Sequence, residues 1–258
     1  MEAHLDEILN RAMTSGGLSV RYQPIRSVSE GRFVSAEAVI ALSDEVYGDI
    51  DSELLITAAE ERGLSVCLGS RVLEEVFGFA GSETFRRTGL SQIYVGLSVT
   101  QCMRMELTDI IWNLRERSMT APQHIAFIIR ESSYENMSRV FNENLKKLSA
   151  QGYTLVLDGF GHGYSNVQRL LDMPVRVARL DKNIVRSAGS GGGRAILRGM
   201  IEMVKDIPLE VMAQGADDED TANMLSEMDC GLIQGQFYSG PLTKDELEEI
   251  TVGHRHND

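Results

Sequence analysis

Short runs of apolar residues alternate along this chain with longer segments in which apolar residues recur every three to four positions. The runs have the length of buried strands, and the longer segments have the periodicity of one-sided helices. Strands are predicted at 18–25, 33–42, 92–99, 124–129, 155–158, 175–180, 209–213 and 232–233. Helices are predicted at 2–14, 52–62, 70–87, 104–117, 134–151, 194–206 and 218–228. The glycine-rich run Ser187–Gly193 lacks the Lys and Ser/Thr of a phosphate-binding P-loop, so we expect a flexible loop there.

The alternation of strands and helices continues over the whole chain without a linker. A length of 258 residues allows either one large α/β barrel or two smaller domains. An unbroken strand–helix alternation indicates a closed (β/α) barrel. We therefore expect one domain over residues 1–258, with a core of about 18–243.

Composition and charge narrow the functional classes. Hydrophobic residues make up 43% and charged residues 24%, which is ordinary for a soluble globular protein. No apolar run approaches the ~20 residues of a membrane span, and Met1–His4 does not resemble a secretion signal, so a cytoplasmic location is expected. A net charge of -13 argues against nonspecific nucleic-acid binding, but leaves open a nucleotide in one pocket or a protein partner. Cys67, Cys102 and Cys230 are predicted to be reduced, partly buried thiols, because they are odd in number and widely spaced.

Two acidic residues in apolar strands are the first candidates for a site. Asp158 ends the run Leu155–Leu157 and is followed by a glycine-rich turn, where a backbone can approach a ligand. The alternative is a helix-capping Asp with glycines for the turn. Glu37 interrupts the second strand, and an unpaired buried carboxylate would be costly. It either points outward or points into a site that holds a cation.

Several strand ends taken together resemble one family. The motifs, in order, are Tyr22-Gln23-Pro24-Ile25, Glu37-Ala38-Val39, Asp158-Gly159-Phe160-Gly161-His162-Gly163-Tyr164-Ser165, Asp181-Lys182, Gln214-Gly215 and Gln234-Gly235. The set resembles the EAL domain, the cyclic di-GMP phosphodiesterase domain of bacterial signalling, from the first helix to Pro241-Leu242. The resemblance implies an α/β fold, a modified TIM (β/α)8 barrel whose first strand is antiparallel to the rest. It also implies an active site with two Mg²⁺ or Mn²⁺ ions at the C-terminal strand ends.

The chain departs from the family pattern at most of the implied metal ligands. Three acidic residues match it. At four other ligand positions, three residues offer no side-chain oxygen and Gln214 offers only a neutral one. The matching residues are Glu37, Asp158 and Asp181, and the lost positions are Gly96, Ile128, Gly159 and Gln214. The family's lysine, which assists the attacking water, is replaced by Arg179, and the phosphate-binding arginine is replaced by Ala41.

These departures predict a loss of hydrolysis. Two-metal hydrolysis needs carboxylates that balance about four positive charges and fix both ions. Arg179 cannot act as a deprotonatable amine, so no catalytic residue is assigned. One weakly bound ion between Glu37 and Asp158 is left open. The resemblance implies ligand contacts at Gln23, Pro24, Gln234, Gly235, Pro241 and Leu242, and Arg179 is expected to hold a phosphate bidentately.

The leading functional prediction is a degenerate EAL-like barrel that acts as a cyclic di-GMP receptor or as a protein-interaction module. The alternative is a metal-dependent cyclic di-GMP phosphodiesterase with a rearranged metal site. No cofactor is expected unless activity remains, in which case Mg²⁺ or Mn²⁺ would serve. A protein partner is expected and a homodimer is left open. His162 is interpreted as an exposed loop residue, and His254 and His256 as parts of a polar tail.

Overall fold

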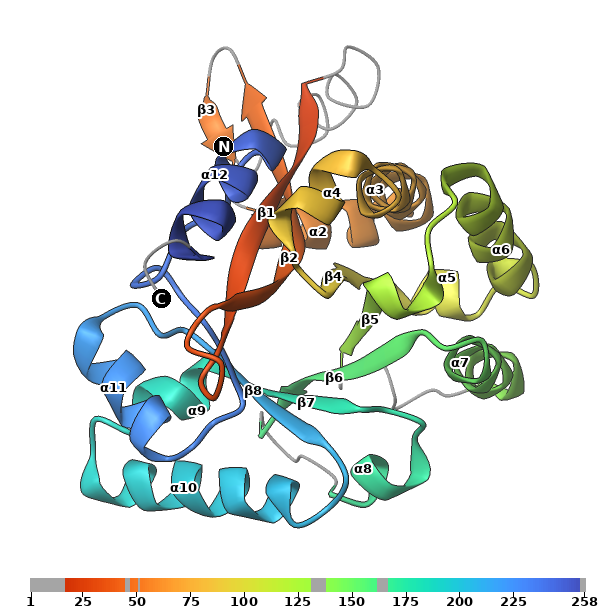
Figure 1. Ribbon diagram of the computed structural model, residues 1–258. Coiled ribbons are helices and arrows are strands. Elements are labelled where there is room, and N and C mark those ends of the chain that lie inside the picture. Colours follow the sequence, from red (N-terminus) through yellow and green to blue (C-terminus); the bar gives the residue numbers. More distant parts are fainter. Residues whose placement is uncertain (1–16, 45–46, 51, 131–137, 162–166, 256–258) are drawn as a thin grey trace.

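The chain folds into a closed barrel surrounded by helices (Figure 1). The computed structural model describes residues 17–44, 47–50, 52–130, 138–161 and 167–255. The helix predicted at 2–14 and the predictions for His162 and His256 lie outside these residues. The barrel strands are β1 (Leu18–Ser27), β2 (Phe33–Asp44), β4 (Gln92–Gly96), β5 (Ile125–Arg130), β6 (Thr154–Phe160), β7 (Val177–Leu180), β8 (Glu210–Gln214) and β9 (Leu232–Gln234).

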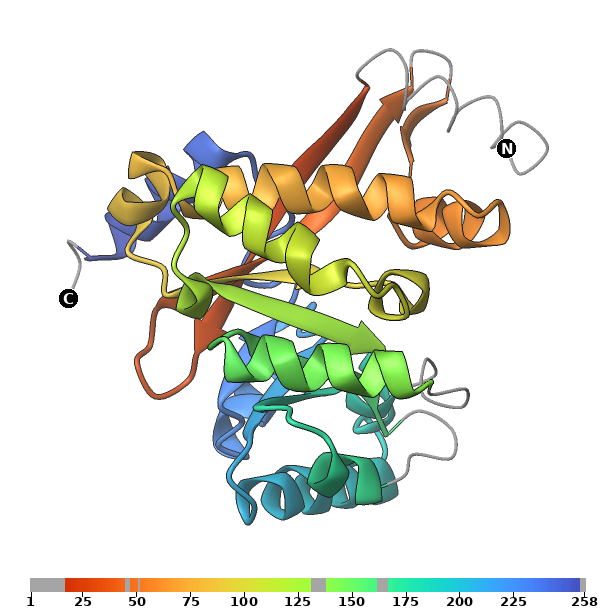
Figure 2. The ribbon, with the colours of Figure 1, turned by 90° about the vertical axis from the view of Figure 1, so that its right-hand side faces the viewer.

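The pairing of these strands confirms the predicted architecture. β1 runs antiparallel to both of its neighbours, β2 and β9, whereas the pairs from β2 through β4 to β9 are parallel. The ring of eight strands closes because β1 pairs with β2 as well as with β9. The short strand β3 (Gly48–Ile50) pairs with the end of β2, and β1, β2 and β3 project beyond the barrel (Figures 1 and 2).

Helices cover the outside of the barrel. They are α2 (Ser52–Glu61), α3 (Ser65–Ala80), α4 (Glu83–Thr88), α5 (Val99–Cys102), α6 (Leu107–Ser118), α7 (Arg139–Ala150), α8 (Gln168–Asp172), α9 (Lys182–Ser187), α10 (Gly191–Lys205), α11 (Glu219–Glu227) and α12 (Lys244–Arg255), with a 3-10 turn at Pro122–His124. In the described ranges, no helix has both the length and the apolar character needed to cross a membrane.

The apolar core has two layers, as expected for a barrel covered by helices. The larger layer lies between the strands and the helices. The smaller layer fills the barrel, because every barrel strand contributes at least one inward-facing side chain to it. Its members are Ile25, Val34, Tyr94, Ala126, Ile128, Val156, Val177, Met212 and Leu232.

Three predicted segments differ from the structure. The helix predicted at 70–87 is two helices, because Gly81 passes close to the carbonyl oxygen of Ser118 and Ser82 caps α4 by accepting a hydrogen bond from the Phe85 amide at 3.1 Å. The loop predicted at Ser187–Gly193 is wrong at its end, because Gly191–Gly193 form the first turn of α10 and Ser190 caps it. The strand predicted at 92–99 ends at Gly96.

Two further expectations need correction. The polar tail expected around His254 belongs to α12, which the sequence did not reveal; Leu247 of this helix is fully buried. The three cysteines are free, but Cys67 is exposed rather than partly buried.

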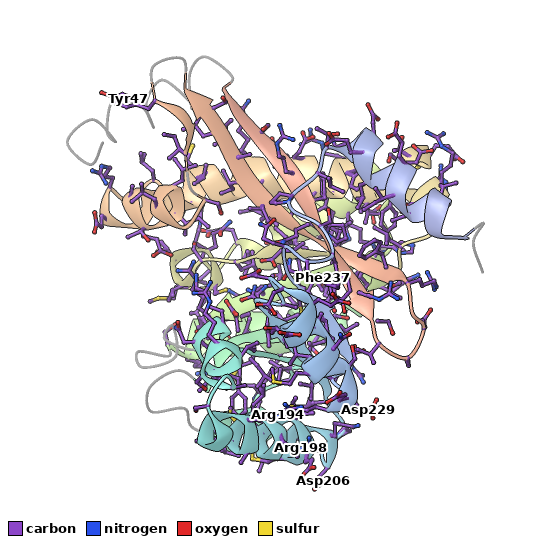
Figure 3. The ribbon with its side chains drawn as sticks, turned by 90° about the vertical axis from the view of Figure 1, so that its left-hand side faces the viewer. Tyr47, Arg194, Arg198, Asp206, Asp229 and Phe237 are labelled. Carbon is purple, nitrogen blue, oxygen red and sulfur yellow. The ribbon has the colours of Figure 1, made fainter. Side chains whose placement is uncertain are left out.

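The seam between β1 and β9 is short. Only Arg26 and Ser27 of β1 pair with β9. Beyond them the segment that follows β9 returns along β1, where the Tyr22 amide donates to the Leu242 carbonyl at 2.7 Å and the Leu242 amide donates back at 2.9 Å. Figure 3 shows Phe237, which belongs to this returning segment, on the surface beside β1. The C-terminal segment therefore completes the closure that β9 begins.

Candidate functional site

The candidate site is a layer of side chains directly above the apolar filling of the barrel. Side chains of a strand alternate between its two faces, so the residue two places after an inward-facing residue also faces inward. Applied to the apolar members Tyr94, Ala126, Val156, Val177, Met212 and Leu232, this rule gives one further inward position on each of six strands. Those positions are Gly96, Ile128, Asp158, Arg179, Gln214 and Gln234.

Glu37 joins this layer from β2. It lies opposite Tyr94 of β4 in a parallel register and opposite Gln23 of β1 in an antiparallel one. Tyr94 faces the barrel interior, and directly paired residues share a face, so Glu37 also faces inward. The structure thus favours the inward-pointing interpretation of Glu37.

Arg179 lies between the two inward-facing carboxylates. Its Nε donates a hydrogen bond to Asp158 Oδ1 at 2.7 Å, and its Nη1 donates to Glu37 Oε2 at 2.7 Å. The Arg179 side chain is 5% exposed, whereas Glu37 and Asp158 are 17% and 16% exposed. Most of the guanidinium is therefore turned toward the carboxylates rather than toward a ligand, and a phosphate contact by Arg179 stays a prediction.

Glu37, Asp158 and Arg179 form an ion triad, and its electrostatics favour the charged forms of Asp158 and Arg179. Burial would raise the pKa of Asp158, but the Arg179 charge and hydrogen bond outweigh it and hold this pKa below its ordinary value. Burial would likewise lower the pKa of Arg179, but the charges of Glu37 and Asp158 and their hydrogen bonds raise it above its ordinary value. Two carboxylates and one guanidinium give the triad a formal charge of -1.

The remaining implied metal positions do not complete a site for divalent ions. A Cβ atom at Gly96 or at Gly159 would meet nothing within 4 Å, so both positions open onto free space. Ile128 is buried with the apolar interior. Asp181 caps α9, where its Oδ1 accepts a hydrogen bond from the Asn183 amide at 2.8 Å.

We therefore find that these residues do not fit a pair of Mg²⁺ or Mn²⁺ ions. Such ions need several oxygen ligands converging on one point. Within the described part of the chain, no three His, Cys, Asp or Glu residues are grouped in that way. The guanidinium of Arg179 instead provides the positive charge between Glu37 and Asp158.

A chain of three amide side chains borders the triad. Gln214 Nε2 lies 3.5 Å from Gln234 Oε1, Gln234 Nε2 donates to Gln23 Oε1 at 3.2 Å, and Gln23 Nε2 donates to the Ser239 carbonyl at 3.1 Å. This row of amide side chains crosses the seam between β1 and β9. It also links the mouth of the barrel to the segment that leads into α12.

The other predicted ligand positions lie along the same seam. Pro24 is buried in β1, next to Gln23. Gly235 follows β9 at a point where a Cβ would lie only 2.0 Å from the Ala216 carbonyl oxygen, so only glycine fits. Pro241 is exposed and Leu242 forms the bridge to β1. The structure brings these residues to one side of the mouth, and their contact with a ligand stays a prediction.

Sequence reasoning missed the ion triad and the amide chain. The two ends of the Arg179–Glu37 bond are 142 positions apart, so no local pattern reveals it. A signal was present nevertheless. An arginine two positions before Asp181, together with carboxylates that had lost their companions, indicates a cation supplied by the protein itself.

Comparison with known proteins places this geometry in a family. The sequence matches the EAL domain family over residues 6–241. It is 28% identical over 250 residues to an uncharacterised protein of Azorhizobium caulinodans, covering 95% of this chain and 34% of that protein. It is 25% identical over 240 residues to the bifunctional diguanylate cyclase/cyclic di-GMP phosphodiesterase MucR of Pseudomonas aeruginosa, covering 93% of this chain and 35% of MucR. The chain thus spans about a third of the length of these relatives.

Among solved structures, a complex of the PaMucR phosphodiesterase with cyclic di-GMP is similar to this chain. The TM-score is 0.87 at 25% sequence identity, over 95% of this chain and 99% of that one. The fold described above is shared with this structure.

Proposed function

Because the chain belongs to the EAL domain family, we propose that it acts in cyclic di-GMP signalling by binding the dinucleotide at the barrel mouth without hydrolysing it. One observation carries the proposal. The Arg179 guanidinium occupies the space between Glu37 and Asp158 and donates to both at 2.7 Å.

The triad opposes hydrolysis for two reasons. A guanidinium supplies a single fixed charge and has no coordination site, so it cannot hold or activate the attacking water as a metal ion does. A metal would also have to displace it from both carboxylates, against two charge-assisted hydrogen bonds. Hydrolysis through a rearranged metal site is therefore the less favoured candidate.

Binding is supported by what the mouth retains. The amide groups of Gln23 and Gln234 present donors and acceptors of the kind that a guanine edge can pair with. Arg130 is exposed at the end of β5, opposite Asp158 in the next strand, and its charge helps to lower the pKa of Asp158. This cation is placed to attract a phosphate. The similar solved structure of the MucR phosphodiesterase holds cyclic di-GMP, which supports the choice of ligand.

Calorimetry with cyclic di-GMP, in Mg²⁺ and again in EDTA, tests the binding half of the proposal. We expect saturable heat and a Kd that is the same within about twofold in both buffers, because the protein supplies its own cation. The Arg130→Gln variant should weaken binding about tenfold, the loss of one charge-assisted contact. The Arg176→Gln variant is the matched control, since Arg176 is exposed next to the first residue of β7, at the opposite end of the barrel.

A turnover assay with cyclic di-GMP and Mn²⁺ tests the other half. The expected result is no linear dinucleotide, with the MucR phosphodiesterase domain run in parallel as the active control. Conversion at the rate of that control would refute the claim that Arg179 replaces the metals. If calorimetry detects no heat even at a high concentration of cyclic di-GMP, the receptor proposal is refuted and a role as a protein adaptor is favoured.

A further inference from the structure

The outer face of α6 carries an exposed apolar stripe. Met105, Trp112 and Met119 are 76%, 51% and 87% exposed. Met105 lies in the turn before α6, Trp112 lies within the helix and Met119 is its C-cap, so the three side chains follow one another along this element at intervals of seven residues. α6 lies in the outermost layer of the molecule and faces the viewer in Figure 2.

Such a stripe is unusual on a surface. Isolated exposed apolar residues are common, but contiguous ones that reach a few hundred Å² mark interaction sites. Methionine side chains are flexible and adapt to different partners, and tryptophan is enriched at the energetic centres of interfaces. Trp112 lies at the middle of the row with a methionine on either side. An amphipathic helix binds its partners through such an apolar face.

One flank of the stripe is acidic. Asp109 precedes Trp112 by three positions and Glu116 follows it by four, so both lie beside Trp112 on the helix surface. Both are exposed, and within the described residues Asp109 has no ion-pair partner. Among the described residues, Glu116 forms an ion pair with Arg115, whose Nε is 3.8 Å from Glu116 Oε1, too far for a hydrogen bond. This flank is therefore available to a basic group from outside.

A hollow lies at the end of the same stripe. It has a volume of about 260 Å³, which is room for one large side chain, and is lined by residues 115–116 and 119–122. The exposed Met119 forms its edge and adopts a left-handed backbone conformation with φ 55°. Nearby, the Tyr153 hydroxyl is buried and has no hydrogen-bond partner. Burial raises the pKa of Tyr153 to about 12, and the charges of Arg115 and Glu116 act on the same hydroxyl.

We propose that the outer face of α6 is a docking surface for an amphipathic helix of another protein, one that carries basic residues beside its apolar face. The stripe would contact the apolar face, the acidic flank would pair with the basic residues, and one large apolar side chain would enter the hollow. A second copy of this chain fits less well, because the flank is acidic and each copy carries a net charge of -13.

Trp112 provides the readout, because it is the single tryptophan of the chain. The probe is a tryptophan-free helical peptide of Leu and Lys, roughly five turns long, and its counterpart replaces every Lys with Glu. We expect the Leu/Lys peptide to shift the Trp112 emission to shorter wavelength and to saturate, and the Leu/Glu peptide to bind at least about tenfold more weakly.

Variants separate a specific surface from general stickiness. Met105→Glu should weaken binding of the Leu/Lys peptide about tenfold. Ile196→Glu, which alters an exposed apolar residue of α10, should leave the affinity for this peptide unchanged. Asp109→Lys combined with Glu116→Lys should reverse the preference toward the Leu/Glu peptide. Circular dichroism confirms that each variant is folded.

Three results would overturn the proposal. Equal binding of both peptides would show that charge plays no part. An equal loss in the Ile196→Glu variant would show that the peptide adsorbs elsewhere. Self-association in sedimentation experiments that is abolished by Met105→Glu would show that a second copy covers the stripe.

Discussion

Replacing Arg179 by Met is the most direct test of the ion triad. The change removes the cation and leaves Glu37 and Asp158 facing one another while both are largely buried. Removing one partner of a buried ion pair costs about 3–5 kcal/mol, because the remaining charge is neither hydrated nor paired. In a chain of this size each kcal/mol shifts the melting temperature by about 2–4 °C, so a fall of roughly 6–20 °C is expected at pH 7.

The stability difference between the native protein and the Arg179→Met variant should depend on pH in a defined direction. In the native protein the pKa of Asp158 is lowered, so its stabilising effect is present above the unfolded pKa of about 3.9 and is lost as the pH falls through the lower native value. In the Arg179→Met variant, like charge and burial should raise the carboxylate pKa values. Its deficit should therefore shrink as the pH falls from 7 toward 5, because one carboxylate takes up a proton. Melting curves over this range measure the difference.

Mn²⁺ provides a second readout on the same variant. With the guanidinium removed, the two carboxylates can accept a divalent ion, which should stabilise the variant by about 1.4 kcal/mol at ten times its Kd. The wild-type protein should not respond. A triple variant that also carries Glu37→Gln and Asp158→Asn has no charges left and should recover part of the lost stability without responding to Mn²⁺. A melting temperature unchanged by Arg179→Met, or equal stabilisation of the wild type by Mn²⁺, would refute the reasoning.

Three further predictions concern the seam and the open positions. Gly235→Ala should lower the free energy of unfolding in urea by at least about 2 kcal/mol, because its Cβ would lie 2.0 Å from a carbonyl oxygen; Gly199→Ala, in open space on α10, should raise it by about 0.5–1 kcal/mol. Gly96→Asn with Gly159→Asp should fold at a cost of about 1–2 kcal/mol, because Gly159 has a left-handed φ of 79°. It should yield no linear dinucleotide from cyclic di-GMP while the guanidinium stays in place; turnover would contradict the blocking role. Gln23→Leu should speed hydrogen exchange in residues 239–242, and unchanged exchange would show that the amide chain does not hold them.

The strands could be predicted closely because their signal is local. Apolar runs of strand length marked every barrel strand, and the family resemblance supplied the antiparallel first strand, which periodicity does not encode. Helix limits were less accurate, because contacts from elsewhere set them. The break at Gly81 depends on the close approach of Ser118, and α12 is stabilised by burial of Leu247, although its sequence is mostly polar.

The site could be predicted as a list of positions but not as an arrangement. The resemblance pointed to Glu37, Asp158 and Arg179, and alternation along the strands explains why they share a layer. Neither the resemblance nor the alternation could show that Arg179 donates to both carboxylates, because this contact depends on how three separate strands are placed across the barrel. A cation expected in the site proved to be a side chain of the protein itself.

The short seam between β1 and β9 also bears on how the chain is made. Gln23 and its partner Gln234 are 211 positions apart, so the ribosome delivers the first strand long before the strand that closes on it. At about 5–20 residues per second, β1 waits roughly 10–40 s with one edge unpaired. Exposed strand edges template aggregation. A nascent chain that stalls before β9 is made would therefore depend on chaperones. Once residues up to Leu242 have left the ribosome, β9 and the segment after it can pair with β1 and close the barrel.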